Sequence, residues 1–217
     1  MKNQAAGKSL ILGVTGASGA IFARRTLQML EADARVAKIH LVISGSGLKV
    51  LREELALDVS RSAEIPELLA GGRTHRTTKT VYLLDSDIGA SIASGSYPVD
   101  GMVVVPCSMG CLAQIAHGIA STLIERAADV CLKERRKLIL ALRDTPLSRV
   151  HLENMLRAHD AGAEIFPINL SFYQQPRTIE DLVTQFCCRL LAHLGLGQPQ
   201  QFRWTGTPLP TKSQRRG

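Results

Sequence analysis

The stretch SLILGV (residues 9–14) runs directly into TGASG (residues 15–19) near the start of the chain. The apolar run predicts a buried strand, and the amphipathic stretch Ala20–Leu30 predicts a helix. Glycine permits tight turns and close backbone approach, so residues 15–19 are expected to form the turn between them. Amide groups at the start of a helix attract anions, and the Ser18 hydroxyl adds a donor. Taken alone, the motif fits both a plain turn and a ligand-binding turn.

The same alternation of apolar runs and amphipathic stretches continues to residue 194. It predicts an α/β fold with a mainly parallel sheet and helices on both faces. Right-handed crossovers then place the carboxyl ends of the strands at one common edge. Further strands are expected at Ile39–Ile43, Val81–Leu84, Met102–Val105, Leu138–Leu142 and Ala163–Phe166, and further helices at Leu48–Leu55, Ser121–Lys133, Ser148–His159 and Ile179–Leu194.

Length and charge fit one compact domain between two basic ends. The chain has 217 residues, of which 45% are apolar. We expect a flexible N-terminus over residues 1–8, a single domain over 9–198, and a basic tail over 199–217 that is flexible unless Phe202 and Trp204 anchor it to a partner subunit. The formal net charge is +7, and removing the six cations of residues 1–9 and 203–217 leaves +1 for the rest. Because the excess lies in the ends and only 4% of residues are aromatic, nucleic-acid and membrane partners are disfavoured.

The cysteines and the first residues of the chain indicate in which cellular compartment the protein is expected. An odd number of cysteines without a small disulfide scaffold indicates free thiols in a reducing compartment; they are Cys107, Cys111, Cys131, Cys187 and Cys188. The first two have no matching Cys or His pair, so no metal site is expected. Residues 1–9 lack the apolar core of a signal peptide, and no apolar run reaches the roughly 20 residues of a membrane span. We therefore expect a cytoplasmic protein without a metal.

The turn at residues 15–19 does not fit the nicotinamide fingerprint. Counted from Gly16, the pattern Gly-x-Gly-x-x-Gly needs glycines where Ser18 and Ile21 stand. The second strand ends at Ile43-Ser44, where an acid for the ribose would be expected. No tyrosine is followed by a lysine four residues later. A nicotinamide reductase is therefore disfavoured.

Loops rich in small hydroxyl residues adjoin several of the predicted strands. They are SGSG at 44–47, ASGS at 93–96, PCSMGC at 106–111, RDTP at 143–146, and the segment Asn169–Pro176 with Tyr173. Ligands of open α/β sheets bind beyond the carboxyl ends of the strands. Such loops at one edge fit a planar ligand with a phosphate tail.

These blocks resemble the UbiX family of flavin prenyltransferases across nearly all of residues 9–204. The match is carried by TGASG at 15–19, ASGS at 93–96, PCSM at 106–109, LIERAADV at 123–130, LKERR at 132–136, HLENM at 151–155 and FYQQP at 172–176. The resemblance implies a flavodoxin-like, Rossmann-like three-layer fold. It implies transfer of the dimethylallyl group of dimethylallyl phosphate to nitrogen five and carbon six of reduced FMN, without a metal. It also implies a homododecamer with active sites at subunit contacts, and a product that serves a UbiD-type decarboxylase.

The resemblance also implies roles for individual residues. Flavin contacts are expected at Gly16, Ala17, Ser18, Ser44, Ser108, Met109, Gly110, Cys111, Arg126 and Arg143. Lys133, Tyr173 and Arg189 are expected to bind the donor, and the catalytic set comprises these three with Glu54, Arg143 and Asp144. Cations at the phosphate oxygens stabilise the charge that grows on the leaving group. By pattern alone, Glu54, Arg126 and Lys133 fit exposed helix positions better than functional ones.

Two positions depart from the family pattern, and two other functions stay open. Cys111 stands where family members usually have Thr or Ser, and Asp144 where they usually have Glu, so weaker flavin binding or a lower rate is expected. A flavin-dependent cysteine decarboxylase is one alternative, although the segment Ile92–Ser96 lacks the Asn of that group. A flavin-binding carrier without catalysis is the other.

Overall fold

The computed structural model describes residues 7–72 and 75–206 of the chain. The chain divides into two compact units, residues 1–168 and residues 169–217. The domain limits expected from the sequence, at residues 9 and 198, stay a prediction. Residues 1–6 of the expected flexible N-terminus and residues 207–217 of the expected tail lie outside the described residues.

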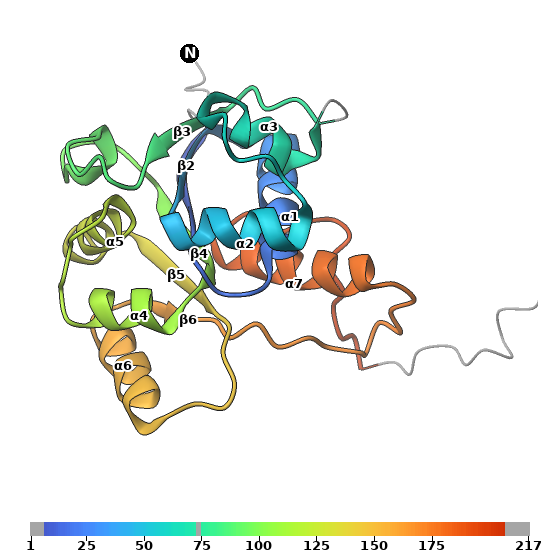
Figure 1. Cartoon of the computed structure of the whole chain (residues 1–217). Helices are drawn as coiled ribbons and strands as arrows, with labels where there is room; N and C mark the ends of the chain where they lie inside the picture. The colour runs from blue at the N-terminus through green and yellow to red at the C-terminus, as the bar shows by residue number, and fades with distance from the viewer. Residues whose placement is uncertain (1–6, 73–74, 207–217) are drawn as a thin grey trace, which may run out of the picture. The chain divides into compact units, whose positions relative to one another are not determined.

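The first unit is built on a six-stranded sheet in which every neighbouring pair is parallel. The strands are β1 Lys8–Val14, β2 Val36–Ile43, β3 Thr80–Leu84, β4 Gly101–Cys107, β5 Lys137–Leu142 and β6 Glu164–Ile165. Their order is β3-β2-β1-β4-β5-β6 (Figure 1). The direction of winding reverses between β1 and β4, and a sheet of this type opens a crevice at that reversal. The expected α/β fold with a parallel sheet is confirmed.

Helices cover both faces of this sheet (Figure 1). They are α1 Ala20–Ala32, α2 Gly45–Leu55, α3 Ile65–Ala70, α4 Met109–Ala116, α5 Leu123–Lys133 and α6 Arg149–Asp160, with 3-10 turns η1 Ser62–Glu64 and η3 Ser91–Ala93. The helices expected from the sequence are confirmed to within three residues at their ends. Helices α3 and α4 were not predicted. Helix α4 has only eight residues, nearly all apolar, so no polar face marks its period.

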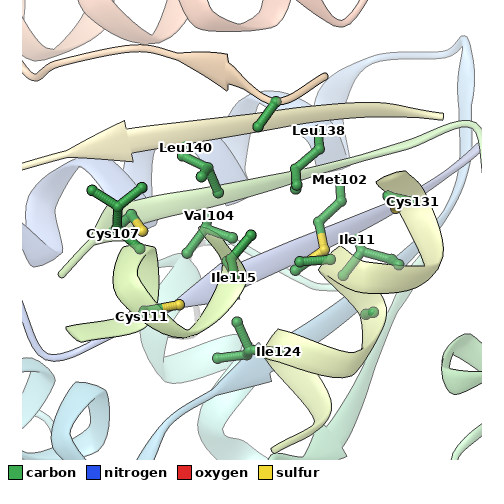
Figure 2. Packing of buried hydrophobic residues seen from close by; sticks show 14 of the residues in the cluster. Ile11, Met102, Val104, Cys107, Cys111, Ile115, Ile124, Cys131, Leu138 and Leu140 are labelled. Atoms are coloured by element: carbon green, nitrogen blue, oxygen red, sulfur yellow. The ribbon is translucent and has the colours of Figure 1, made fainter. Parts of the chain in front are cut away.

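The core on one face lies between the sheet and helices α4, α5 and α6. Ile11, Met102 and Leu138 are paired across β1, β4 and β5, and alternation along each strand sends them to the same face. Figure 2 shows these side chains packed with Ile115 and Ile124 from the covering helices. This buried layer fixes where α4 and α5 begin, and both helices begin at the carboxyl edge of the sheet.

The second unit contains one long helix, α7 Ile179–His193. Its start is capped by Thr178, whose hydroxyl accepts a hydrogen bond from the amide of Asp181 at 3.1 Å. Gln200 and Phe202 of the expected tail are hydrogen-bonded to Gln185 of this helix. None of the helices within residues 7–72 and 75–206 is long and apolar enough to cross a membrane.

Candidate functional site

Thr15 joins the two turns that flank the reversal of the sheet. Its buried hydroxyl donates to the carbonyl of Pro106 at 2.9 Å and accepts from the amide of Ser108 at 2.8 Å. Its own amide also donates to Pro106 at 3.2 Å. The turn after β1 and the turn after β4 therefore hold each other in place. The sequence places Thr15 in the TGASG motif, but no role was predicted for it.

Two serines begin the helices that follow β2 and β4. Ser44 accepts a hydrogen bond from the amide of Gly47 at 3.0 Å, and Ser108 accepts one from the amide of Cys111 at 3.3 Å. Both are helix N-caps, which explains their positions directly after a strand. The sequence analysis expected both as flavin contacts, and the structure brings them to strand ends at the same edge.

Gly16 allows the first turn to approach the start of α2. A Cβ atom on Gly16 would lie 2.5 Å from both Cβ and Oγ of Ser46. By contrast, a Cβ on Gly110, at the start of α4, would have no atom within 4 Å. The structure thus requires glycine at residue 16, while Gly110 leaves open space above α4.

A cavity of about 360 Å³ opens at this edge of the sheet. Its lining consists of Thr15, Ser44, Gly45, Ser46, Asp85, Ser108, Gly110, Cys111, Gln114, Thr122, Ile124 and Glu125. Three helix starts therefore meet around one cavity, because α2, α4 and α5 all begin there. The starts of α2 and α4 are capped by neutral hydroxyls, so their partial positive charge faces the cavity, and the acids of the lining, Asp85 and Glu125, belong to other elements.

The start of α5 differs because carboxylates cap it. Glu125 is 6% exposed and accepts from the amides of Ser121 and Thr122, each at 3.0 Å. Asp85 accepts from the amide of Ile124 at 3.1 Å. Burial raises the pKa of Asp85, and the charge of Glu125 adds to the rise, which the hydrogen bonds from the start of α5 only partly offset. The sequence analysis missed both acids, and the capping spacing Thr122-x-x-Glu125 was the available signal for one of them.

In the loop after β4, the side chain of Cys111 lines the cavity and that of Met109 packs in the core. Met109 is 8% exposed and belongs to the buried cluster, so its side chain packs inward. Cys111 lines the cavity, close to Cys107 (Figure 2). A hydrogen bond with Cys107, together with burial, raises the pKa of the Cys111 thiol, which therefore stays protonated at neutral pH. Both cysteines are free thiols, as the sequence predicts.

Glu54 from α2 occupies the start of α1. Its carboxylate accepts from the amide of Gly19 at 2.9 Å and from the amide of Ala20 at 2.8 Å. Burial alone would raise the pKa of Glu54, but hydrogen bonds from Ser18, Gly19 and Ala20 and the charge of Arg143 bring it below its ordinary value. The expectation that these amides are free for a ligand anion is therefore corrected: an acidic side chain of the same unit already accepts from them.

Arg143 and Asp144 follow β5 beside this helix start. The Arg143 guanidinium donates to the carbonyl of Ser18 at 3.3 Å, and its amide donates to the carbonyl of Cys107 at 3.3 Å. Asp144 accepts from the amide of its neighbour Thr145 at 2.8 Å. The structure thus brings Ser18, Glu54 and Arg143 together, next to the buried Ala17.

Arg126 and Lys133 lie on α5 but not in the cavity lining. Arg126 donates to the carbonyl of Ala93 at 3.1 Å and pairs with Asp129 at 2.7 Å. Lys133 is at the last turn of α5, 3.5 Å from the carboxylate of Glu134, with 48% of its side chain exposed. Because α5 begins at the carboxyl edge and leads into β5, its last turn lies at the opposite, amino edge. The first unit alone therefore does not bring Lys133 to Arg143.

Tyr173 and Arg189 belong to the second unit. The Tyr173 ring is 67% exposed and lies 5.7 Å from the ring of Trp204, at an angle of 58°. Arg189 is exposed on α7 between the buried Cys188 and Leu190. Its guanidinium has no hydrogen-bond or ion-pair partner within the part of the chain that the structure describes. The sequence analysis gave Trp204 no part in the site, because nothing in the pattern links it to Tyr173.

Comparisons with known proteins agree with this architecture. A family model described as Flavoprotein matches residues 1–190. The chain is 43% identical over 194 residues to a protein of Halalkalibacterium halodurans named Flavin prenyltransferase UbiX, covering 89% of this chain and 91% of that one.

Solved structures of UbiX-like proteins also resemble the chain. The chain superposes with a TM-score of 0.80 and 38% identity on AnUbiX (PadA1) in complex with FMN and dimethylallyl pyrophosphate, covering 93% of this chain and 99% of that one. It superposes with a TM-score of 0.78 and 40% identity on a dodecameric FMN-dependent UbiX-like decarboxylase from Escherichia coli O157:H7, covering 91% and 100%. Two FMN-dependent cysteine decarboxylases are only 12% and 19% identical, so they share the fold alone.

Proposed function

The chain belongs to the UbiX family of flavin prenyltransferases, and we propose on that premise that it prenylates reduced FMN. The donor is dimethylallyl phosphate, and the product is prenylated FMN for a UbiD-type decarboxylase. The observation that carries the proposal is the cavity at the reversal of the sheet, which Thr15 holds together and which two serine-capped helices face.

The residues of this cavity fit FMN. The starts of α2 and α4 offer hydroxyls and positive helix ends to a phosphate, whereas the acidic start of α5 repels one. The phosphate is therefore assigned to Ser44, Ser46 and Ser108, with the open space over Gly110 available to the rest of the flavin. The ribityl hydroxyls can donate to Asp85, which lines the cavity and also accepts hydrogen bonds from the amide of Ile124 and the side chain of Thr122. The neighbouring turns complete the proposed flavin contacts with Gly16, Ala17, Ser18, Met109 and Cys111.

Reduced FMN supplies the nucleophilic nitrogen and carbon atoms of this reaction, and the protein supplies charge and position. We assign Arg143, Lys133 and Arg189 to the donor phosphate, because three cations offset the charge that develops as the carbon–oxygen bond breaks. Arg189 is suited to this role because its guanidinium has no partner among the described residues.

The aromatic pair Tyr173 and Trp204 is assigned to the dimethylallyl group. Electron-rich ring faces stabilise the cationic character that develops on the allyl carbons. Both rings are more than 60% exposed, so a large part of each face is open to a ligand.

Glu54 and Asp144 are assigned to the handling of the phosphate and its proton. Glu54 stays ionised because its pKa is lowered, so at neutral pH it accepts a hydrogen bond from Ser18 and holds Arg143 by charge. Asp144 is held by a hydrogen bond from the amide of Thr145 to one carboxylate oxygen, which leaves its second oxygen available.

The placement of Lys133 supports an assembled enzyme. Lys133 and Arg126 lie away from the cavity of their own first unit, so we propose that they act at the site of a neighbouring copy in a homododecamer. We further propose that this assembly is cytoplasmic.

Anaerobic incubation with reduced FMN and dimethylallyl phosphate tests the proposal directly. Mass spectrometry should show one five-carbon unit added to the flavin, and release of inorganic phosphate should match it mole for mole. A parallel reaction with dimethylallyl pyrophosphate identifies the preferred donor. Tight FMN binding without any mass gain would refute the enzyme and leave a flavin carrier.

A further inference from the structure

A single glutamine of α7 holds the segment that carries the tryptophan. The side-chain amide of Gln185 donates to the carbonyl of Gln200 at 2.9 Å and accepts from the amide of Phe202 at 2.8 Å. These two backbone groups are two residues apart, so one amide engages the segment as a neighbouring strand would. We call residues 198–204 the strap.

The strap begins at a turn of its own. Gln198 donates through its side chain to the carbonyl of Leu196 at 2.8 Å, and the amide of Gln201 donates to the carbonyl of Gln198 at 3.2 Å. The turn sets the direction of the strap, and Gln185 fixes it two residues before Trp204. At its far end the strap is in contact with Tyr173 through the ring of Trp204.

The ring pair alone does not order the strap. An aromatic pair contributes at most about as much free energy as fixing the backbone of one residue costs, and the strap contains several residues. Both rings are largely exposed, at 67% for Tyr173 and 63% for Trp204, so burial adds little. The hydrogen bonds of Gln185, together with the half-buried Phe202 side chain, therefore contribute to the position of Trp204.

Gln185 also stands one helical turn before Arg189. Residues four apart in a helix lie on the same face, and Gln185 is half-buried while Arg189 is exposed. One face of α7 thus carries the group that holds the aromatic pair and the cation assigned to the phosphate. Both ends of a prenyl phosphate, the prenyl group and the phosphate, would then be positioned by residues of the single helix α7.

We infer that Gln185 is a positioning residue for the prenyl donor: it sets Trp204 against Tyr173 and so completes the aromatic wall for the dimethylallyl group. The inference rests on the proposed function for the identity of the donor. The placement of Trp204 by Gln185 does not depend on that function and can be measured separately.

The experiment compares Gln185→Leu with Gln200→Ala in the full-length protein. Leucine has a similar size but no amide, whereas the side chain of Gln200 makes no hydrogen bond within residues 7–72 and 75–206. Trp204 is the only tryptophan of the chain, so its fluorescence reports the strap alone. We expect Gln185→Leu to shift the emission to longer wavelength and to increase acrylamide quenching by up to about 1.6-fold, the ratio of full exposure to the present 63%, because the strap loses an ordering contact. Gln200→Ala should leave both unchanged.

Steady-state kinetics supply the second readout. Loss of the two hydrogen bonds of Gln185 predicts a KM for dimethylallyl phosphate raised roughly tenfold or more. The FMN dissociation constant should not change. Gln185→Glu keeps the acceptor for Phe202 and should fall between wild type and Gln185→Leu.

Three results would overturn the inference. The first is unchanged Trp204 emission and quenching in Gln185→Leu. The second is changed emission with an unchanged donor KM, which would separate the strap from the donor site. The third is equal loss in Gln200→Ala. If Gln185→Leu loses FMN binding through misfolding, Gln185→Glu takes its place. Failure of the wild-type protein to prenylate flavin would refute the proposed function, while the fluorescence comparison would still decide the role of Gln185.

Discussion

The two edges of the sheet in the first unit differ in the side chains they carry and in how firmly these are held. At the carboxyl edge, short side chains such as Thr15, Ser44 and Ser108 are held by hydrogen bonds to backbone groups of the turns and helix starts. At the amino edge, Lys133 is a long side chain, nearly half exposed, with one ion pair at 3.5 Å. Surface ion pairs of that kind contribute little positioning. On the proposed function, a single copy pre-forms the cavity assigned to the flavin, whereas the charge at the amino edge is fixed by a neighbouring copy.

The largest expected effect comes from removing the charge at the amino edge. Lys133→Ala should lower kcat by about 100-fold, the scale for loss of one group that stabilises transition-state charge, while FMN binding stays intact. Arg135→Ala is the matched control, because Arg135 is an exposed cation two residues away. Equal loss in both variants would mean that general charge at this edge is responsible. Turnover should return partly when Lys133→Ala subunits are mixed with Arg143→Ala subunits, if neighbouring copies complete the site.

The second-largest effect is expected from adding a side chain at Gly16, where the turn after β1 lies close to Ser46 at the carboxyl edge. Gly16→Ala places a methyl group 2.5 Å from Ser46, and such overlap costs about 1–3 kcal/mol. Because the turn must shift to relieve the overlap, we expect FMN affinity to fall in a fluorescence titration by up to about 100-fold, the ratio that corresponds to the upper end of that cost. Gly110→Ala is the control, because its added methyl meets no protein atom within 4 Å. If Gly110→Ala harms affinity more than Gly16→Ala does, then the flavin rather than Ser46 sets the limit.

Removing the link between the two turns should have a smaller effect. Thr15→Val leaves the amide of Ser108 and the carbonyl of Pro106 without their hydroxyl partner, at a cost of about 1–2 kcal/mol. Urea unfolding should show this loss, and the FMN dissociation constant should rise by up to about tenfold. Thr15→Ser keeps the hydroxyl and removes only a buried methyl group, so it should cost less, about 0.8 kcal/mol. A serine variant as weak as the valine variant would shift the cause from hydrogen bonding to packing of the methyl group.

The smallest effect concerns the acidic cap of α1. Glu54→Gln should lower the free energy of unfolding by about 0.3–1 kcal/mol at pH 7, the scale of a solvent-screened charge at a helix start. Because the folded pKa of Glu54 is lowered, its contribution is present above the unfolded pKa and is lost as the pH falls through the folded pKa. The difference between wild type and variant should therefore vanish in acid. Glu53→Gln is the matched control, because Glu53 is an exposed carboxylate one residue earlier, and it should leave the free energy of unfolding at pH 7 close to that of wild type.

Much of the architecture could be predicted because it repeats along the chain. The longer strands of the sheet contain apolar runs, and each longer helix has a periodic face, so α1, α5 and α6 were expected within three residues of their limits. Helix α4 could not be predicted in this way, because eight mostly apolar residues have no distinguishable polar face. The serine caps Ser44 and Ser108 were visible as small residues after strands, although their partners were not.

The sequence by itself determined that the chain is a parallel α/β flavoprotein of the UbiX family, since strand periods and long specific blocks are local properties. Only the tertiary structure decided which groups meet. In the structure, the Glu54 carboxylate accepts hydrogen bonds from the amides of Gly19 and Ala20, and Lys133 lies at the amino edge of the sheet, opposite the cavity. Hydrogen bonds and charge act over a few ångströms between residues far apart in the chain, so no local pattern could assign these partners.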